Sequence, residues 1–455
     1  MTYCVVGGGI SGLTAVYRLR AAVGDQARIL LFDPAARLGG LLRTERIGGQ
    51  PMDVGAEAFL LRRPEVPALL AELGLTDRQL STTGVRPMIY SQAQLHPLPA
   101  ETVVGIPSTA TSMAGLVDHA TVLRIAGEPD RRLHWQPGSD PAVAAIVEDR
   151  FGEQVVARSV DPLLCGVYAG SAAGIGMRSA VPGVAAALDR GAASLTAAVR
   201  QALPTATGAP LFGALDGGYC VLVDELVRHG RPQWVQAGVT NIRGDRQGWS
   251  LRDDTGVEWH ADAVVLAVPA PRLTPLLADI APPAAAAVNR IASASAAVVA
   301  LAVPAATPFP QCSGVLVASG EQLGAKAITL SSQKWGLRGD VGLLRLSFGR
   351  FDDAAENPAC RVTDQDLITW ALADLATVFG VDVEPIDVRV QRWLELMPQY
   401  GPGHAAGVAQ LQAGLPSSVA VAGNYLDGIG VPACIASAGR AVARVLGAAE
   451  SEMAP

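Results

Sequence analysis

The chain has 455 residues, half of them apolar and 17% charged, and its net charge is −7. This length predicts two or three domains with large buried cores, and the composition argues against long disordered regions. The negative charge, with no basic run, argues against a nucleic-acid partner. The six cysteines are scattered without a CxxC pair, so we expect neither a metal site nor a disulfide framework.

Neither a membrane span nor an export signal is expected. The longest apolar stretch, residues 292–306, is shorter than the roughly 18 to 20 residues that a spanning helix needs. The chain opens on a strand pattern, without the basic region and apolar run of a secretory signal. We therefore expect a cytoplasmic protein.

A strand, a glycine turn and a helix follow one another at the N-terminus. The apolar run Tyr3–Val6 leads into Gly7-Gly8-Gly9-Ile10-Ser11-Gly12, and helical spacing follows over Leu13–Val23. Such glycines permit a sharp turn, close approach of backbone to a pyrophosphate and tight helix packing, while the helix N-terminus faces the phosphate charge. A second run, Ala27–Phe32, ends in Asp33, which could accept hydrogen bonds from a ribose. The pattern predicts a dinucleotide site.

Further segments are expected to pass close to this site. Arg37-Leu38-Gly39-Gly40 follows the acidic strand end, and Asp53-Val54-Gly55-Ala56-Glu57 follows a short glycine-rich hairpin. An apolar strand over Ala261–Ala267 ends before Pro269, and Val239 precedes that strand. Paired glycines would let the backbone pass close to a bound ring system.

This succession resembles the large FAD superfamily that contains amine oxidases, phytoene desaturases and protoporphyrinogen oxidases. The first βαβ unit does not by itself separate NAD from FAD, because both dinucleotides present the same pyrophosphate. The resemblance also implies a C-terminal return, in which a strand and a glycine loop lead into a helix that faces the flavin. Val419–Gly423, Asp427–Pro432 and Ala433–Leu446 have these three patterns.

FAD is therefore the expected cofactor, and most residues expected near it are small because backbone has to approach it closely. Val239 and Trp393 are placed there by resemblance alone. The expected contacts are Gly7, Gly8, Gly9, Ile10, Ser11, Gly12, Asp33, Pro34, Gly39, Gly40, Gly55, Ala56, Glu57, Ala58, Val239, Trp393, Ile429, Gly430 and Val431.

Within this superfamily the chain resembles the bacterial protoporphyrinogen and coproporphyrinogen oxidases over nearly its full length. The matching stretches, in order, are 95–99 with 105–107, 161–170, Met397-Pro398-Gln399-Tyr400 with Gly403-His404, and 428–432. One departure is Ala433-Cys434, where many relatives carry aspartate before the cysteine. Similarity to the soluble enzymes of Gram-positive bacteria implies coproporphyrinogen III as substrate. Protoporphyrinogen IX stays an alternative, as does another amine-oxidase-like or desaturase reaction.

The resemblance implies oxidation of the bridging carbons of a porphyrinogen in two-electron steps, with hydride passing to the flavin, oxygen as acceptor and peroxide as by-product. An electron-rich pyrrole stabilises the developing positive charge, so positioning is expected to dominate catalysis. No GxSxG, HExxH or GxxxxGK[ST] motif is present, and the six histidines are dispersed.

Arginine is the expected partner of the substrate carboxylates, because its fork recognises a carboxylate through two hydrogen bonds. Arg63 resembles a position that the family places near substrate, and Arg62 is the second choice. Both equally suit solvated arginines at the start of a helix over Pro64–Leu73. Tyr400 either lines the pocket or belongs to the core.

The expected fold class is α/β with α+β inserts. A Rossmann-type FAD-binding domain would comprise residues 1–90, 205–290 and 393–455, with a substrate-binding domain from 91–107 and 291–392 and a helical insert over 108–204. Strands over Ala296–Val303 and Gly342–Phe348 would form a mixed sheet, and the insert would contain helices over Pro141–Phe151 and Pro182–Leu203. The insert touches membrane in relatives, but its interspersed charges favour a soluble lid with at most weak surface contact. Monomer and homodimer stay open.

Two rival classes share the first βαβ unit. A nicotinamide-dependent dehydrogenase would not need the glycine-rich return near the C-terminus. A non-enzymatic binder on the same scaffold, like the GDP-dissociation inhibitors, would not need the intact glycine set with Asp33. Flavin absorbance of the purified protein separates both from an FAD enzyme.

Overall fold

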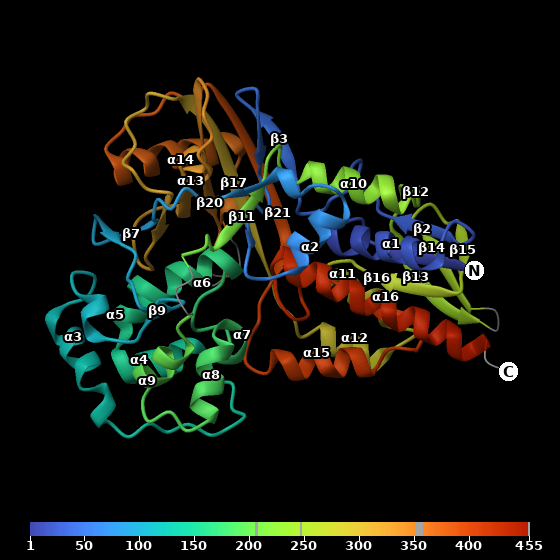
Figure 1. Cartoon of the computed structure of the whole chain (residues 1–455), viewed down its shortest axis with the longest axis horizontal. Helices are drawn as coiled ribbons and strands as arrows, with labels where there is room; N and C mark the ends of the chain where they lie inside the picture. The colour runs from blue at the N-terminus through green and yellow to red at the C-terminus, as the bar shows by residue number, and fades with distance from the viewer. Residues whose placement is uncertain (205–207, 246–247, 352–357, 454–455) are drawn as a thin grey trace.

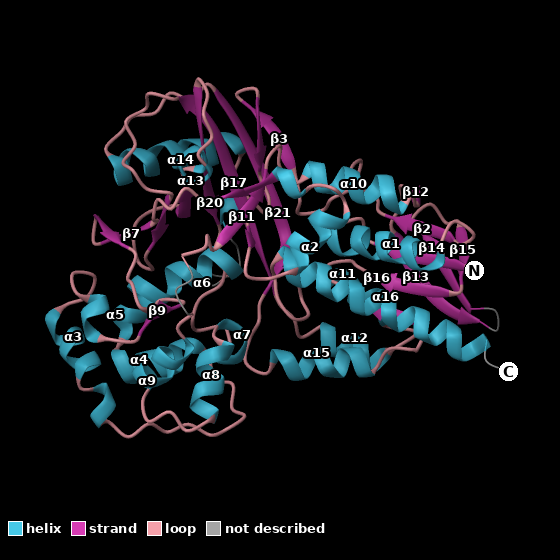
Figure 2. Cartoon of the chain, viewed as in Figure 1, coloured by secondary structure: helices cyan, strands magenta, loops and turns pink. Residues whose placement is uncertain are grey.

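The structure is a computed structural model that describes residues 1–204, 208–245, 248–351 and 358–453. The molecule is elongated, with a parallel sheet and both chain termini at one end and a group of helices at the other (Figure 1). A second, larger sheet lies beside the helices (Figure 2).

The parallel sheet combines strands from distant parts of the sequence. Its order is β12 (Gln233–Val235), β2 (Arg28–Phe32), β1 (Thr2–Val6), β16 (Ala263–Leu266) and β22 (Val419–Val421). All four pairings are parallel. Apart from the edge strand β12, these strands are nearly continuous apolar runs, as parallel strands are when layers cover both faces.

Alternate residues of the central strand β1 serve two separate cores, as the two-residue period of a strand requires. Tyr3 and Val5 pack with the helices α1 (Ile10–Val23), α10 (Cys220–Gly230) and α16 (Val431–Met453). Cys4 and Val6 point to the opposite layer. That layer contains β13 (Val239–Asp245), β14 (Gly248–Asp253), β15 (Glu258–Ala261), α11 (Ala270–Leu277), α12 (Pro282–Val288) and α15 (His404–Ala413). We call these three layers the parallel-sheet part.

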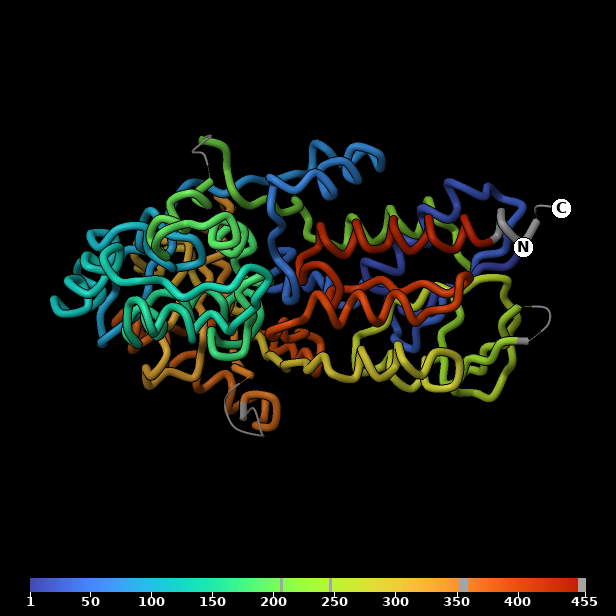
Figure 3. The backbone as a smooth tube through the Cα atoms, turned by 90° about the horizontal axis from the view of Figure 1, so that it is seen from below, coloured from blue at the N-terminus to red at the C-terminus, as the bar shows by residue number. Residues whose placement is uncertain are grey.

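Helix α16 has an 18-residue window, Val431–Ala448, that by length and composition alone would suffice to cross a membrane. Half of this window is buried, and Ala438, Ala441 and Val445 belong to the core that contains α1. Figure 3 shows the helix running beside the N-terminal segments. A helix that forms part of a protein core meets the same criteria.

A seven-stranded mixed sheet forms the second part of the molecule. Its order is β21 (Asp387–Pro398), β17 (Ser293–Pro304), β20 (Val341–Phe348), β19 (Ala325–Thr329), β18 (Gly314–Val317), β7 (Met88–Ser91) and β8 (Gln94–Pro97). The β18–β7 pair is parallel and the others are antiparallel. Helix α14 (Asp364–Phe379) packs on this sheet through Leu367, Ala371 and Leu375, and α13 (Ser331–Trp335) lies beside β20. The strands expected over Ala296–Val303 and Gly342–Phe348 are confirmed.

Seven helices make up the helical part. They are α3 (His119–Ala126), α4 (Val143–Phe151), α5 (Glu153–Val155), α6 (Asp161–Tyr168), α7 (Met177–Ala180), α8 (Pro182–Asp189) and α9 (Leu195–Ala202), with a π-helical turn over Val156–Val160. The helical pattern expected over Pro182–Leu203 forms two helices, because the chain turns between α8 and α9. Gly191 has φ +89° there, and Ser194 caps α9 by accepting a hydrogen bond from the Ala197 N–H.

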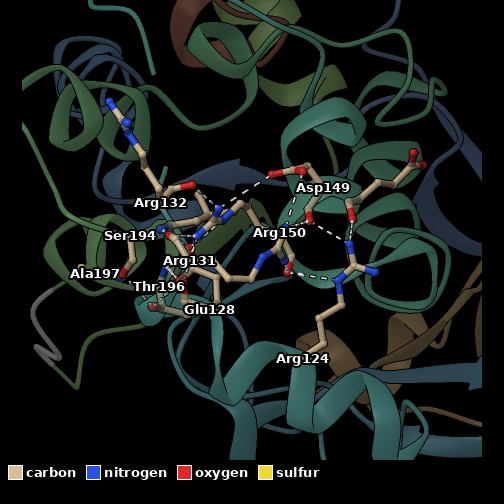
Figure 4. A network of polar contacts seen from close by, with 11 residues as sticks. Arg124, Glu128, Arg131, Arg132, Asp149, Arg150, Ser194, Thr196 and Ala197 are labelled. Carbon is tan, nitrogen blue, oxygen red and sulfur yellow. Dashed lines mark hydrogen bonds and ion pairs between the residues drawn. The ribbon is translucent and has the colours of Figure 1, made fainter. Parts of the chain in front are cut away.

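A buried ion pair stands at the centre of the helical part (Figure 4). The Arg150 Nε donates to the Glu128 carboxylate at 2.9 Å, and the two side chains are 2% and 0% exposed. The remaining guanidinium N–H groups donate to the carbonyls of Glu128, Arg131 and Arg132. The Glu128 carboxylate also accepts from the backbone N–H groups of Leu195 and Thr196, so it holds the negative charge that suits the N-terminus of α9.

Smaller elements connect the three parts. They are the hairpin β3 (Thr44–Ile47) and β4 (Gln50–Asp53), the sheet β5 (Phe59–Leu60), β11 (Phe212–Leu215) and β6 (Gln79–Ser81), the pair β9 (Thr102–Val103) and β10 (Ile106–Pro107), and α2 (Glu65–Glu72). The domain division expected from sequence stays a prediction. Residue 205, where its second FAD-binding piece would begin, lies outside the described residues, and β21 spans its boundary at 392/393.

Candidate cofactor site and active site

A cavity of about 1150 Å³ opens where the strands of the parallel sheet end. Its wall includes Val6 at the end of β1 and Asp33 just beyond β2, and Ala267 and Gly423 beyond β16 and β22. Ligands of open parallel sheets bind at this carboxyl edge, because the loops and helix N-termini converge there. The volume is slightly above the usual range for drug-sized ligands, about 300 to 1,000 Å³, so it has room for a large ligand such as a dinucleotide.

The structure brings most of the residues expected near FAD to this one cavity. Those that line it are Gly7, Gly9, Ile10, Ser11, Asp33, Pro34, Gly40, Ala56, Ala58, Val239, Trp393, Ile429, Gly430 and Val431. Gly8, Gly12, Gly39, Gly55 and Glu57 stand next to lining residues in the chain and are not part of the wall. Direct contact of each residue with the cofactor stays a prediction.

Close backbone packing explains several of these glycines, including two that do not line the cavity. A Cβ at Gly12 would lie 1.8 Å from the Gly7 carbonyl oxygen, and one at Gly55 would lie 1.9 Å from that of Leu41. Gly7 itself has φ +107°, which residues with a side chain rarely adopt. These positions therefore shape the turns that hold the cavity open.

Gly9 differs, because a Cβ there would meet only the Cα of Gly40, at 4.0 Å, and would otherwise project into open space. Residues Ile10 and Ser11 of the α1 N-terminus line the same wall, where their backbone N–H groups have no partner within the helix. Three arginines, Arg37, Arg43 and Arg272, line the cavity against the single acid Asp33. Bare backbone, a helix N-terminus and an excess of positive charge fit a pyrophosphate.

The Asp33 carboxylate accepts the Gly8 N–H at 2.6 Å and the Ala35 N–H at 2.9 Å. Two carboxylate oxygens offer about four acceptor positions. Capacity therefore remains for a ribose hydroxyl, and the two backbone bonds fix the direction in which the carboxylate points.

Glu57 points away from the cavity into an ion cluster beneath it. Its carboxylate accepts from the Lys334 Nζ at 2.6 Å and from the Ser331 hydroxyl at 2.7 Å. Burial by itself would raise the pKa of Glu57, but the charges of Lys334 and Arg345 lower it to about 2. Arg345 also donates to the Gly55 carbonyl at 2.8 Å, so the cluster ties the loop that carries Ala56 and Ala58 to the mixed sheet.

Asp53 precedes this loop and is buried beside the cluster. Its carboxylate accepts from the Thr44 hydroxyl at 2.6 Å and from the Tyr219 N–H at 3.1 Å. Burial raises the pKa of Asp53 to about 7 in spite of these hydrogen bonds. The loop is therefore anchored at one end by a carboxyl group that titrates near neutral pH.

The arginines expected at the substrate do not line this cavity. Arg63 has a side chain that is 44% exposed and donates to the Glu65 carboxylate at 2.6 Å, at the start of α2. Arg62 is exposed beside it. Trp393 lines the cavity and donates through Nε1 to the Val54 carbonyl at 3.0 Å. Tyr400 is a buried residue that lies behind the wall.

Sequence reasoning missed several lining residues. Asn424 lies between strand β22 and the expected glycine loop, Leu396 follows Trp393 on β21, and Arg43 and Arg272 supply positive charge. The position of Asn424 directly after a buried strand was a usable signal, because strand ends converge on this edge. Among the described residues, no cluster of His, Cys, Asp and Glu side chains could hold a metal ion.

A parallel sheet with a glycine turn, an acid after its second strand and a C-terminal return to the same cavity defines a dinucleotide-binding flavoprotein. Residues 10–446 match the family of flavin containing amine oxidoreductases. The chain belongs to this family, and its cofactor is FAD.

Similar proteins cover the whole chain. A Mycobacterium tuberculosis protein named coproporphyrinogen III oxidase is 68% identical over 100% of this chain and 99% of its own length. A Bacillus subtilis protein of the same name is 27% identical over 97% of each chain. A crystal structure from Exiguobacterium sp. 255-15, provisionally described as a protoporphyrinogen oxidase, has a TM-score of 0.88 at 25% identity and covers 99% of each chain.

Proposed function

We propose that this protein oxidises coproporphyrinogen III to coproporphyrin III, a step of haem biosynthesis, with FAD as cofactor and oxygen as acceptor. The observation that carries the proposal is the 68% identity, end to end, with proteins named coproporphyrinogen III oxidase. The cavity at the carboxyl edge of the parallel sheet supports it, since it supplies a dinucleotide site within the same chain.

The cavity-lining residues divide into roles by their chemistry. The backbone at Gly7 and Gly9 and the N-terminus of α1 would hold the pyrophosphate, and Asp33 would accept a ribose hydroxyl. Val239, on the wall formed by β13, would contact the adenine. Ala56, Ala58, Trp393 and Ile429–Val431, on the mixed-sheet side and on the C-terminal loop, would surround the flavin ring.

Bound FAD supplies a two-electron acceptor that oxygen can reoxidise. Each step takes a hydride from a bridge carbon and a proton from a pyrrole nitrogen, and oxygen leaves as hydrogen peroxide with two electrons and two protons. No buried histidine or carboxylate of the described residues lines the cavity as a candidate base, apart from the half-buried Asp33 at the ribose end. The protein therefore contributes mainly by orienting the substrate and excluding water.

The experiment is a comparison of initial rates with reduced coproporphyrinogen III and protoporphyrinogen IX, with peroxide measured in the same samples. The proposal predicts faster oxidation of coproporphyrinogen and one peroxide for each two-electron step. A yellow protein that oxidises neither compound would overturn it.

Protoporphyrinogen IX is the second candidate, and the 28% identity over 98% of this chain with the Homo sapiens protein named protoporphyrinogen oxidase favours it. Coproporphyrinogen carries four propionates where protoporphyrinogen carries two, so arginine substitutions should affect the former more strongly. Faster oxidation of protoporphyrinogen IX than of coproporphyrinogen III would make protoporphyrinogen oxidation the favoured function.

We also propose that the enzyme works in the cytoplasm and that the helical part makes at most weak contact with a membrane surface. The charged residues of that part support this, for example Glu148, Asp149 and Glu153. Cell fractionation and vesicle sedimentation test the placement. Light scattering decides between monomer and homodimer.

A further inference from the structure

The segment Gln399–His404 connects β21 to α15 and carries the Gln-Tyr and Gly-His pairs that resemble the porphyrinogen oxidases. None of its residues lines the cofactor cavity. Tyr400 is 3% exposed all the same, and its hydroxyl is fully engaged in hydrogen bonds. The segment therefore calls for an explanation other than direct contact with the cofactor.

On one side the segment holds the loop that follows β22. The Tyr400 hydroxyl donates to the Asn424 carbonyl at 2.5 Å and accepts from the Gly428 N–H at 3.0 Å. The His404 ring stacks on Tyr400 with centroids 3.9 Å apart and an interplanar angle of 20°. Its Nε2 donates to the Leu426 carbonyl at 3.1 Å, and burial lowers the pKa of His404, which favours the neutral ring.

This loop is part of the cofactor cavity. Asn424, Ile429 and Gly430 line its wall on both sides of the stretch that Tyr400 and His404 hold. Gly428 has φ +150°, a conformation that glycine adopts readily and leaves readily. The loop thus depends on outside contacts for a single conformation, and the two aromatic side chains supply them.

On its other side the segment is bonded to the helical part. The Gly176 N–H donates to the Tyr400 carbonyl at 2.8 Å. The Asp140 carboxylate accepts from the Gly403 N–H at 2.8 Å through one oxygen and from the Arg178 N–H at 2.8 Å through the other. The same few residues therefore contact both the helical part and the cofactor loop.

We propose that Tyr400 is a positioning residue, whose hydroxyl fixes the loop 424–428 against bound FAD and makes the position of that loop depend on docking of the helical part. The inference rests on the proposed function in one respect, because the helical part is taken to be the cover over the porphyrinogen site. Removal of the hydroxyl leaves a carbonyl and an N–H of the loop without their partner, so the loop relaxes at the edge of the flavin.

The first test is Tyr400→Phe, which keeps the ring and its stacking on His404. We expect the dissociation constant of FAD from the refilled apoprotein to rise about tenfold, which is about 1.4 kcal/mol, and the visible bands of bound flavin to shift. Tyr17→Phe is the matched control. It also removes one tyrosine hydroxyl, but that hydroxyl donates a hydrogen bond to Glu72 on the protein surface. Wild-type affinity and spectrum in Tyr400→Phe would overturn the proposal.

A double-mutant cycle tests the link to the helical part. The two carboxylate oxygens of Asp140 each accept a hydrogen bond from a backbone N–H, of Gly403 and of Arg178. Asp140→Asn replaces one of these oxygens with an NH₂ group, which cannot accept, so one of the two hydrogen bonds is lost. We expect it to weaken FAD binding about threefold alone and to add nothing in the Tyr400→Phe background. An equal threefold loss in both backgrounds would overturn the link.

His404→Phe gives a second variant that tests the same loop contacts. Should Tyr400→Phe not fold, His404→Phe retains the stacked ring and removes only the bond to Leu426, and it is expected to change the flavin bands in the same direction. Wild-type flavin bands in His404→Phe would then count against the proposal. FAD titration uses no porphyrinogen, so it tests the role of Tyr400 independently of the substrate. A wild-type protein that binds FAD but does not oxidise coproporphyrinogen would contradict the proposed function without affecting this test.

Discussion

The parallel-sheet part and the helical part both bring distant chain segments together, but they use different chemical groups to do so. At the cofactor cavity, glycines where the backbone comes close stand among mostly apolar lining residues, with few charged side chains. In the helical part, a buried arginine and a buried glutamate hold three chain segments together, at residues 128–132, 150 and 195–196. A site made of backbone leaves a glycine pattern in the sequence, whereas a core made around one ion pair leaves two ordinary charged residues.

The largest effect on cofactor binding is expected from Gly9→Asp, because its side chain would project into the cavity beside the expected pyrophosphate. Steric overlap and like charge should weaken FAD binding at least a hundredfold, which is about 2.7 kcal/mol, and give colourless protein. The ratio of flavin to protein absorbance measures this. Gly439→Asp is the control, since a Cβ there has nothing within 4 Å. A yellow Gly9→Asp protein would refute the placement of the pyrophosphate.

The helical part can be broken separately with Arg150→Met, which leaves the Glu128 charge buried without its partner. Loss of one member of a buried pair costs about 3 to 5 kcal/mol, measured as the free energy of unfolding in urea. Arg78→Ala, at a pair whose side chains are 51% and 59% exposed, should cost less than about 1 kcal/mol. Equal costs for both variants would show that the pair contributes no more than a surface contact.

Stability is also expected to depend on pH through Asp53, which precedes the loop that carries Ala56 and Ala58. The pKa of Asp53 is about 7 in the folded chain and about 3.9 in an unfolded one, so the folded state binds the proton more tightly. Wild-type stability should therefore fall by up to about 3 kcal/mol as pH rises from about 4 to about 7. Asp53→Asn removes this dependence but keeps an acceptor for Thr44. Urea unfolding at pH 5 and pH 8 measures the difference, and identical pH slopes in both proteins would contradict it.

The smallest effect on the fold, and a selective one on catalysis, is expected from Arg63→Ala. Its partner Glu65 is near the surface, so stability should change by less than about 1 kcal/mol. If Arg63 binds a propionate, the KM for coproporphyrinogen should rise about tenfold with flavin content unchanged. Arg62→Ala is the neighbouring control, and a KM effect in that variant alone would transfer the role to Arg62.

Much of the parallel-sheet part could be predicted because its signals are local. The strands β1, β2, β16 and β22 are apolar runs that end at glycine, aspartate or proline signals, and all four form. Their order in the sheet could not be read in the same way. The placement of β12 at the edge beside β2 depends on pairing between residues about two hundred positions apart.

Where prediction failed, long-range contacts decided the outcome. Residues 190–194 look helical in an alanine-rich stretch, but the Glu128 carboxylate binds the N-terminus of α9 and favours a new helix start at Leu195. The contact of Glu57 with FAD stays a prediction, but its side chain binds Lys334 and Ser331 from a segment far along the chain, and it is not part of the cavity wall. The sequence contains no local sign of either contact.

The cavity has a consequence for synthesis of the protein, because its wall combines β1 with the loop and helix that follow β22. A ribosome makes residues 7–12 long before residues 423–431. Until the later segment has been made, the nucleotide pocket lacks part of its wall, so FAD is expected to bind only after residue 431 has emerged. A chain that stops before residue 423 would lack part of the cavity wall, and it is expected to bind no FAD even if its N-terminal part folds.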